Sequence, residues 1–319
     1  GSGGATGAPP LMPGAPAPAA APPAPAPAAA VPPALVKAES PESVGFTTQG
    51  IKAYIQGVHD YVDKNNTYLP AATTFVARHG KIVVDDVYNG ANLSGGKPLT
   101  ADTIYRIYSM AKPVTAVAML KLYEQGKWTF DDPIDKFIPE FKDKLYTQDA
   151  SGKKTPQRSP TMRELMTHTA GFAYGLSAPG SPLMPMPAAD DAYYNADIFN
   201  VKTREEFLAK VASQPLAYAP GTRWHYSIAV DLQGIIIERL AKKSLAEFMA
   251  ENIFKPLKMV DTGFTVPASK RSRLASLYQA TSDYSGVEIG KVARPYNILE
   301  DILLSEATVM TSGGGGLVL

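Results

Sequence analysis

The chain has 319 residues, 45% of them hydrophobic, which is enough for one large domain or two modest ones. Its 31 basic and 30 acidic residues give a formal net charge of +1, and no basic block is interleaved with aromatic residues, so nothing indicates a nucleic-acid-binding protein. The lack of cysteine excludes disulfides and thiol catalysis, and no apolar run reaches the ~18 residues that a membrane span needs.

Residues 1–44 are predicted to be a disordered tether. Up to Pro33 the sequence is almost wholly Ala, Pro and Gly, and it lacks the apolar side chains that would repay the entropy of ordering. Because such tethers often follow an export signal, we expect a periplasmic or secreted protein, with a cytoplasmic location as the alternative. The folded domain is then expected over residues 45–319.

A helix and a hairpin are predicted at the start of this domain. Apolar residues recur at helical spacing between Thr47 and Asn66. Two runs rich in β-branched residues follow, 71–78 and 81–88, and a break at His79-Gly80 suits a hairpin turn. We therefore interpret His79 as a solvated turn residue.

A long apolar stretch after Lys112 predicts the central helix of the fold. Small and apolar residues run from Val114 to Gly126, which is placed to cap the helix end. Because apolar residues fall on nearly every side, we expect this helix to be buried all round. Ser109 is expected at the helix start, where a hydroxyl is favoured and backbone N–H groups are free, and Pro113 fits in the first turn.

Ser109 and Lys112 form a candidate catalytic pair. They are three residues apart, so one helical turn places both side chains on the same face. A serine hydroxyl is a weak nucleophile until a base takes its proton, and a lysine can be that base in a buried or electropositive setting. The four residues alone also fit a serine cap followed by a lysine that extends to solvent.

The second half of the chain is predicted to be mainly helical. A short helix begins at Thr161, with Glu164 as its capping-box partner, and ends at His168-Thr169-Ala170-Gly171. A loop rich in Pro, Gly, Ala and Met over 178–189 is expected to line a cleft. Asp131-Asp132-Pro133 is interpreted as a turn rather than a metal site. Further helices are predicted over 205–212, 228–240 and 245–253, followed by an irregular polar segment over 267–300.

Tyr226 is the third candidate catalytic residue. It lies in Trp224-His225-Tyr226-Ser227-Ile228, just before a predicted helix. A phenol held near Lys112 could relay the proton of Ser109. Alternatively, Tyr226 is a structural residue whose ring packs in the core and whose hydroxyl lies at the surface.

Several segments together resemble the serine β-lactamase and penicillin-binding-protein superfamily, in particular the class C-like esterases called family VIII carboxylesterases. The matching segments occur in the family's order over roughly residues 45 to 317, which makes the signal highly specific. They are Ser109-Met110-Ala111-Lys112-Pro113-Val114-Thr115, Leu165-Met166-Thr167-His168-Thr169-Ala170-Gly171, Pro220-Gly221-Thr222-Arg223-Trp224-His225-Tyr226-Ser227, the stretch 254–264 and Ser312-Gly313-Gly314-Gly315-Gly316-Leu317.

The resemblance implies an α/β (α+β) fold, with an antiparallel sheet flanked by helices and an all-helical region beside it. It implies Ser109 as the acylated nucleophile and backbone oxyanion donor, Lys112 as base and Tyr226 as proton relay. It also places Trp224, Gly314 and Gly315 at the substrate-binding surface. The expected substrate is a small-molecule ester, with a β-lactam or amide as alternative, and neither a metal nor an organic cofactor is implied.

The sequence departs from the family pattern in two places. The third position of the family's Y-x-N motif is Ile228, which cannot hydrogen-bond a substrate amide and so favours an esterase over a lactamase. In the family a long segment with further sheet strands, a second oxyanion donor and a C-terminal helix follows the glycine-rich stretch, whereas this sequence stops two residues after Leu317. We therefore expect a C-terminally incomplete domain.

Other functional classes fit the sequence less well. No G-x-S-x-G occurs, which disfavours a Ser-His-Asp hydrolase of the α/β type. The four histidines show no H-E-x-x-H spacing, which disfavours a metallohydrolase, and we interpret His168 and His225 as structural. Within the enzyme class the alternative is a β-lactamase or D-alanyl peptidase. Outside it, the alternative is a binding protein that keeps the fold without the chemistry. The sequence gives no indication of oligomeric state.

Overall fold

The computed structural model describes residues 34–65, 69–90, 97–176, 178–180, 186–276, 278–279, 294–295 and 315–319. The predicted tether up to residue 33, much of the predicted irregular segment 267–300 and the site candidate Gly314 lie outside these residues. Within the range assigned to the tether, Val36–Lys37 forms strand β1, which pairs with β3. Ordered structure therefore begins earlier than the predicted boundary at residue 44.

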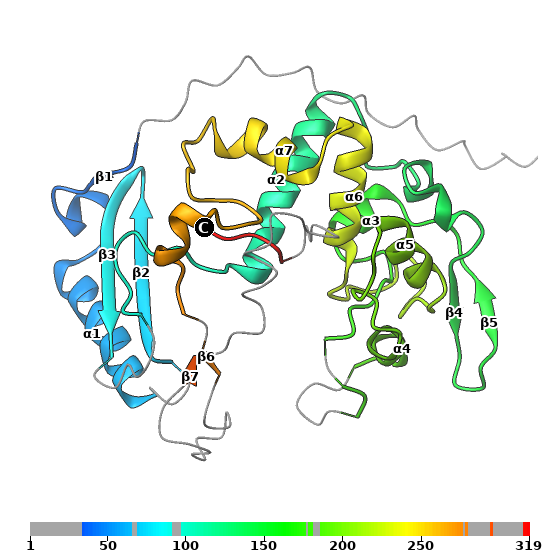
Figure 1. The fold of residues 1–319 in the computed structure, drawn as a ribbon, viewed down its shortest axis with the longest axis horizontal. Helices are drawn as coiled ribbons and strands as arrows, with labels where there is room; N and C mark the ends of the chain where they lie inside the picture. Colours follow the sequence, from blue (N-terminus) through cyan, green and yellow to red (C-terminus); the bar gives the residue numbers. More distant parts are fainter. Residues whose placement is uncertain are drawn as a thin grey trace, which may run out of the picture.

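A small sheet with one helix against it forms the N-terminal part. The strand order is β1-β3-β2, with β3 (Lys81–Asn89) antiparallel to β2 (Ala71–Arg78) and parallel to β1. Helix α1 (Thr48–Lys64) is capped by the Thr47 side chain and packs against both long strands (Figure 1). The predicted helix and hairpin are confirmed, and the hairpin turn places exposed His79 at φ 53°.

The rest of the described chain is largely helical, as predicted, with two short pairs of antiparallel strands. Thr161 and Glu164 form the expected capping box at the start of α3. The α-helices are α2 (Ala111–Glu124), α3 (Met162–Met166), α4 (Ala188–Ala196), α5 (Arg204–Ala212), α6 (Ala229–Ala241) and α7 (Leu245–Met249). A π-helical turn follows α7 at Ala250–Phe254, and 3₁₀ turns lie at Pro41–Val44, Tyr108–Met110, Ile134–Lys136, Pro139–Phe141 and Ala268–Arg273. The short strands are β4 (Tyr146–Gln148), β5 (Lys154–Pro156), β6 (Tyr278–Gln279) and β7 (Arg294–Pro295).

Helix α2 lies between the sheet and the helical group, and it packs directly on α6 (Figure 1). Its core-facing side chains include Ala118, Met119 and Leu122, each 1% exposed or less. The prediction of burial on all sides is wrong for one face, where Val117 is 46% exposed and Leu120 is 42% exposed. An apolar helix is therefore covered only where another element reaches it.

The extended segment just before Ser109 is held from both sides by distant parts of the chain. On one side, Tyr105 and Leu319 exchange two backbone hydrogen bonds, and Ile107 N–H donates to the Leu317 carbonyl. On the other, Ile104 N–H donates to the Arg273 carbonyl, and Ala275 N–H donates to the Ile104 carbonyl, both at 2.8 Å. The chain that leads into the candidate nucleophile is thus fixed in place by backbone pairing.

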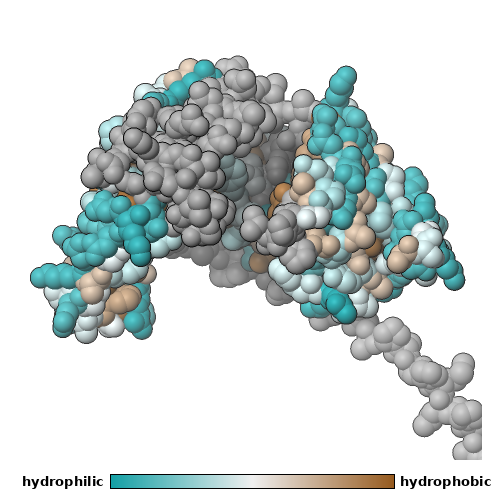
Figure 2. Space-filling view, turned by 90° about the horizontal axis from the view of Figure 1, so that it is seen from below, coloured by the Kyte–Doolittle hydropathy of each residue, from teal (hydrophilic) through white to brown (hydrophobic). Residues whose placement is uncertain are grey.

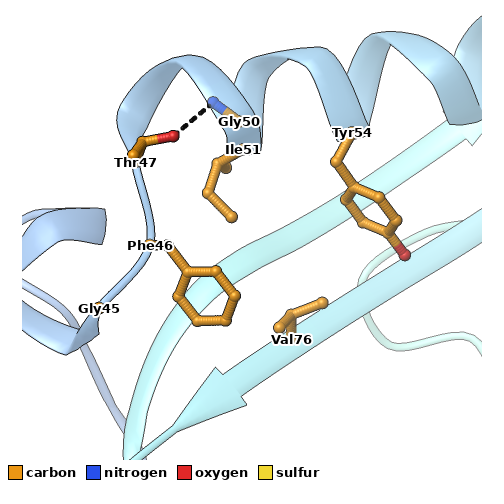
Figure 3. A pocket seen from close by; sticks show the side chains of 7 residues that line it. All are labelled: Gly45, Phe46, Thr47, Gly50, Ile51, Tyr54 and Val76. Carbon is orange, nitrogen blue, oxygen red and sulfur yellow. Dashed lines mark hydrogen bonds between the residues drawn. The ribbon is translucent and has the colours of Figure 1, made fainter.

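The described surface is mainly polar on the face drawn in Figure 2, where hydrophobic residues occur in small patches. A cavity of about 570 Å³ lies between α1 and the sheet, where Phe46, Ile51, Tyr54 and Val76 face one another (Figure 3). This cavity contains none of the predicted site residues. Among the described helices, none combines the length and the apolar character needed to cross a membrane.

Candidate active site

Ser109 lies in the middle of a 3₁₀ turn, Tyr108–Met110, that leads directly into α2. It is not the helix cap that the sequence predicted, because α2 begins two residues later and its capping position is Met110. Tyr108 adopts φ 45°, a left-handed conformation that costs energy for a bulky residue. This bend leaves the exposed Ser109 hydroxyl free of a capping role.

Lys112 and Tyr226 both reach the Ser109 hydroxyl. The Tyr226 hydroxyl donates to Ser109 Oγ at 2.7 Å, and Lys112 Nζ donates to the same oxygen at 3.2 Å. Ser109 and Lys112 come from neighbouring turns, whereas Tyr226 is 117 residues away in sequence. The structure therefore brings together all three side chains that the sequence proposed as catalytic.

Backbone pairing positions the segment that carries Tyr226. His225 N–H donates to the His168 carbonyl at 2.8 Å, and Ile228 N–H donates to the Ala173 carbonyl at 3.0 Å. Backbone hydrogen bonds on both sides of Tyr226, at His225 and at Ile228, therefore fix its position before α6 begins. Its ring packs on the ring of His168, with centroids 5.1 Å apart.

Tyr174 is a further residue of the site that the sequence did not reveal. Its hydroxyl accepts a hydrogen bond from Lys112 Nζ at 3.3 Å, and its ring stacks on Tyr226 with centroids 5.3 Å apart. Lys112 Nζ also lies 4.6 Å from the Tyr226 ring centroid and 5.2 Å from that of Tyr174. Burial, followed by the negative charge of Asp231, raises the pKa of the Tyr174 phenol, so this hydroxyl stays protonated at neutral pH.

His168 is a neutral imidazole beneath the site. The Ser227 backbone N–H donates to its Nδ1 at 3.2 Å, and because an amide can only donate, the ring proton sits on Nε2. Burial, together with the charges of Lys112 and His225, lowers the pKa of His168 to about 4. His168 therefore supports Tyr226 by packing and does not act as a base at neutral pH.

Asp190 and His225 form a second group that the sequence did not connect. Asp190 on α4 is 1% exposed, and its Oδ2 lies 2.7 Å from His225 Nε2. Burial opposes ionisation of this carboxyl, but the hydrogen bonds from His225 and from the Tyr174 N–H prevail and lower the pKa of Asp190. The carboxylate is thus charged in the interior, in contact with the Tyr174 backbone and the His225 side chain.

The remaining predicted site residues lie at the edge of this group. Trp224 is 64% exposed, and its ring centroid lies 6.4 Å from that of Tyr226. Gly315 lies against the Tyr108 backbone, where an added Cβ would be 3.8 Å from the Tyr108 carbonyl carbon. Gly314 is outside the described residues. Among those residues, no group of three or more His, Asp or Glu side chains is placed to hold a metal ion.

A profile of the family described as Beta-lactamase matches residues 56–318. The chain belongs to the beta-lactamase family. This match confirms the predicted family and the β-lactamase-like fold.

The curated proteins to which this chain is similar include two that are named as esterases. Esterase EstB from Burkholderia gladioli is 31% identical over 231 residues, which is 72% of this chain and 56% of that protein. Lovastatin esterase from Penicillium rubens is 33% identical over 205 residues, which is 60% of this chain and 49% of that protein. The chain thus spans about half the length of the curated relatives it matches.

Two solved structures are similar to this chain in fold. EstCE1, described as a hydrolase with promiscuous acyltransferase activity, is 25% identical with a TM-score of 0.65, over 85% of this chain and 69% of that one. Simvastatin synthase (LovD) from Aspergillus terreus is 22% identical with a TM-score of 0.62, over 84% of this chain and 65% of that one. At that identity the second similarity concerns the fold alone.

Proposed function

We propose that this protein is a serine hydrolase that cleaves carboxylic esters through an acyl-enzyme on Ser109. The observation that carries the proposal is the convergence of Tyr226 and Lys112 on one serine oxygen, at 2.7 Å and 3.2 Å. A nucleophile and its base within hydrogen-bond reach are what covalent acyl transfer requires. The names of EstB and lovastatin esterase support an ester as substrate.

In the proposed reaction, Ser109 Oγ attacks the carbonyl carbon of the ester while its proton passes to the base formed by Lys112 and Tyr226. The carbonyl oxygen becomes an oxyanion, and the Ser109 backbone N–H donates to it. When the tetrahedral intermediate collapses, the bond to the alcohol oxygen breaks and the alcohol takes the proton. Water then attacks the Ser109 ester in the same way, which releases the acid and restores the serine.

The site favours an ester over a β-lactam. Ile228, at the position where the family motif has asparagine, is fully buried and presents no polar group to a substrate amide. Trp224 instead offers an exposed aromatic surface beside the catalytic group. We propose that Trp224, with Gly315 beside Tyr108, contacts a short apolar acyl or alcohol group.

The test is intact mass after treatment with a fluorophosphonate probe, with peptide mapping of any adduct, followed by assays with p-nitrophenyl esters and a chromogenic cephalosporin. We expect one adduct, on Ser109, and turnover of the short esters. Ser109→Ala should abolish both, whereas Ser151→Ala, in the exposed β4–β5 turn, should change neither. Ester turnover that survives Ser109→Ala would overturn the assignment, and a folded protein without an adduct would favour the binding-protein alternative.

A further inference from the structure

We propose that Asp190 and His225 are positioning residues, which hold Tyr174 and Tyr226 on the two sides of Lys112 so that Ser109 is activated. The inference rests on the proposed function and concerns how its base is assembled. Among the described residues, the side chains that hydrogen-bond to Ser109 are those of Lys112 and Tyr226, whereas Asp190 and His225 contact each other.

One buried carboxylate joins the backbones that carry the two tyrosines. Asp190 Oδ1 accepts the N–H of Tyr174 at 2.9 Å and the N–H of Gly175 at 3.3 Å. Its other oxygen contacts the side chain of His225, the residue just before Tyr226. Asp190 therefore restrains both segments from a single point on α4.

The Asp190 carboxylate reaches these segments because α4 packs closely against the backbone at Gly175. Gly175 adopts φ +78°, and a Cβ there would lie 2.6 Å from the Tyr194 nitrogen on α4. The helix can approach the backbone this closely because residue 175 has no side chain. With the side chain of Asp190 only 2% exposed and that of His225 12% exposed, water competes little for their contact.

By holding the two tyrosines in place, this restraint also fixes the position of Lys112 Nζ. Lys112 Nζ is bounded by the Tyr174 hydroxyl at 3.3 Å and by the Tyr226 ring centroid at 4.6 Å. A shift of either tyrosine would change the distance between the base and Ser109 Oγ. Displacing a catalytic group by about 1 Å can reduce a rate by about 10²-fold.

A buried carboxylate contact can also have a purely structural role, and the chain offers a matched control for that role. Glu238 on α6 pairs with Arg204 and accepts the Leu245 N–H at the start of α7, so it too is a carboxylate that accepts from one side chain and one backbone N–H. Its partners belong to α5 and α7 rather than to the catalytic group. A loss caused only by destabilisation should appear in both variants.

The test compares Asp190→Asn, His225→Gln, the double variant and Glu238→Gln in the full chain. Asparagine keeps the size of the side chain and an oxygen for the Tyr174 N–H, and removes the charge that faces His225. The first readout is ¹⁹F NMR of fluorotyrosine-labelled protein, with signals assigned by Tyr174→Phe and Tyr226→Phe. The second is the rate of fluorophosphonate labelling at Ser109.

We expect Asp190→Asn to move the signals of both tyrosines and to slow labelling by up to about 10²-fold. The double variant should be no slower than the slower single variant, because both changes break one contact. Glu238→Gln should leave both readouts as in the unchanged protein. Unmoved tyrosine signals in Asp190→Asn, or moved signals with an unchanged labelling rate, would overturn the inference. A wild-type protein that is not labelled would instead overturn the proposed function, while the tyrosine signals still test the restraint.

Discussion

At the scale of single residues, the two tyrosines beside Lys112 have different contacts and should have different effects. Tyr226→Phe removes the hydroxyl that donates to Ser109 Oγ at 2.7 Å but keeps the ring that packs on His168 and Tyr174. We expect the rate of Ser109 acylation to fall by about 10²–10⁴-fold, the contribution of a general acid–base group, with an unchanged melting temperature. The release of p-nitrophenol from a short ester in the pre-steady state measures the acylation rate, and thermal unfolding measures the melting temperature.

Tyr174→Phe is the comparison, because its hydroxyl contacts Lys112 rather than Ser109. Its loss in acylation rate should be smaller than that of Tyr226→Phe. Equal losses would mean that the two hydroxyls contribute equally, which contradicts a distinct relay role for Tyr226.

The neutral state of His168 makes stability depend on pH. Burial, followed by the charges of Lys112 and His225, lowers its pKa from 6.5 to about 4, so between these values the unfolded chain binds more protons than the folded one. The free energy of unfolding should therefore fall as the pH drops from 6.5 towards 4. Because the ring is partly exposed, we expect this loss to be on the order of 1 kcal/mol rather than the full value of the shift.

His168→Asn tests this pH dependence, since asparagine keeps an acceptor for the Ser227 N–H and does not titrate. Urea unfolding at several pH values should show a weaker acid dependence for this variant. His79→Asn is the matched control, because His79 has a similar backbone conformation (φ 53° against 57°) and is exposed at a hairpin tip. An acid dependence identical in all three proteins would contradict the prediction.

At the scale of elements, Gly171 and Gly57 differ in whether the structure has room for a side chain. Gly171 adopts φ +97°, and a Cβ there would lie 2.1 Å from the Tyr218 carbonyl oxygen. Gly171→Ala should force apart the two segments that pair at Gly171 and Ala217, and should lower the free energy of unfolding by at least about 2 kcal/mol. Urea unfolding measures the change.

Gly57 is the control for this substitution. It lies inside α1 with nothing within 4 Å of an added Cβ, and alanine is favoured over glycine in a helix by up to about 1 kcal/mol. Gly57→Ala should therefore leave stability unchanged or raise it. If Gly171→Ala were equally harmless, the close approach at Tyr218 would not constrain the fold.

The elements that were predicted correctly from the sequence are those that depend on local interactions. Helix α1, the β2–β3 hairpin and the Thr161 capping box depend on residues a few positions apart, and all three were predicted correctly. The Asp190–His225 contact joins residues 35 apart through a helix whose packing no local pattern reveals. Ser109, Lys112 and Tyr226 could be proposed from the sequence because they fall in family motifs, and the structure brings their side chains together. Tyr174 falls in no pattern that distinguishes it from a core tyrosine, and only the fold places it beside Lys112.

At the scale of the whole molecule, the proposed nucleophile Ser109 follows a segment that lies between two buried clusters. Ile107, just before the Ser109 turn, and Ala111, just after it, belong to the same buried cluster as α6 and Leu317. A second, smaller cluster joins Ile104 to Val318 on the other side of this segment. The segment that leads into the proposed nucleophile is therefore packed against residues from distant parts of the chain.

Leu317→Ala tests this packing. The side chain is 1% exposed in the principal core, so its truncation leaves a cavity next to the segment that leads into Ser109. We expect the free energy of unfolding to fall by about 2–5 kcal/mol, as for other buried leucines.

Leu257→Ala is the control. At a position 50% exposed, this change should alter the free energy of unfolding by no more than about 0.5 kcal/mol. Urea titrations of both variants give these differences through the transition midpoint, provided that the slope is unchanged. Equal midpoints for the two variants would mean that the 317–319 segment does not contribute to the core that supports the nucleophile.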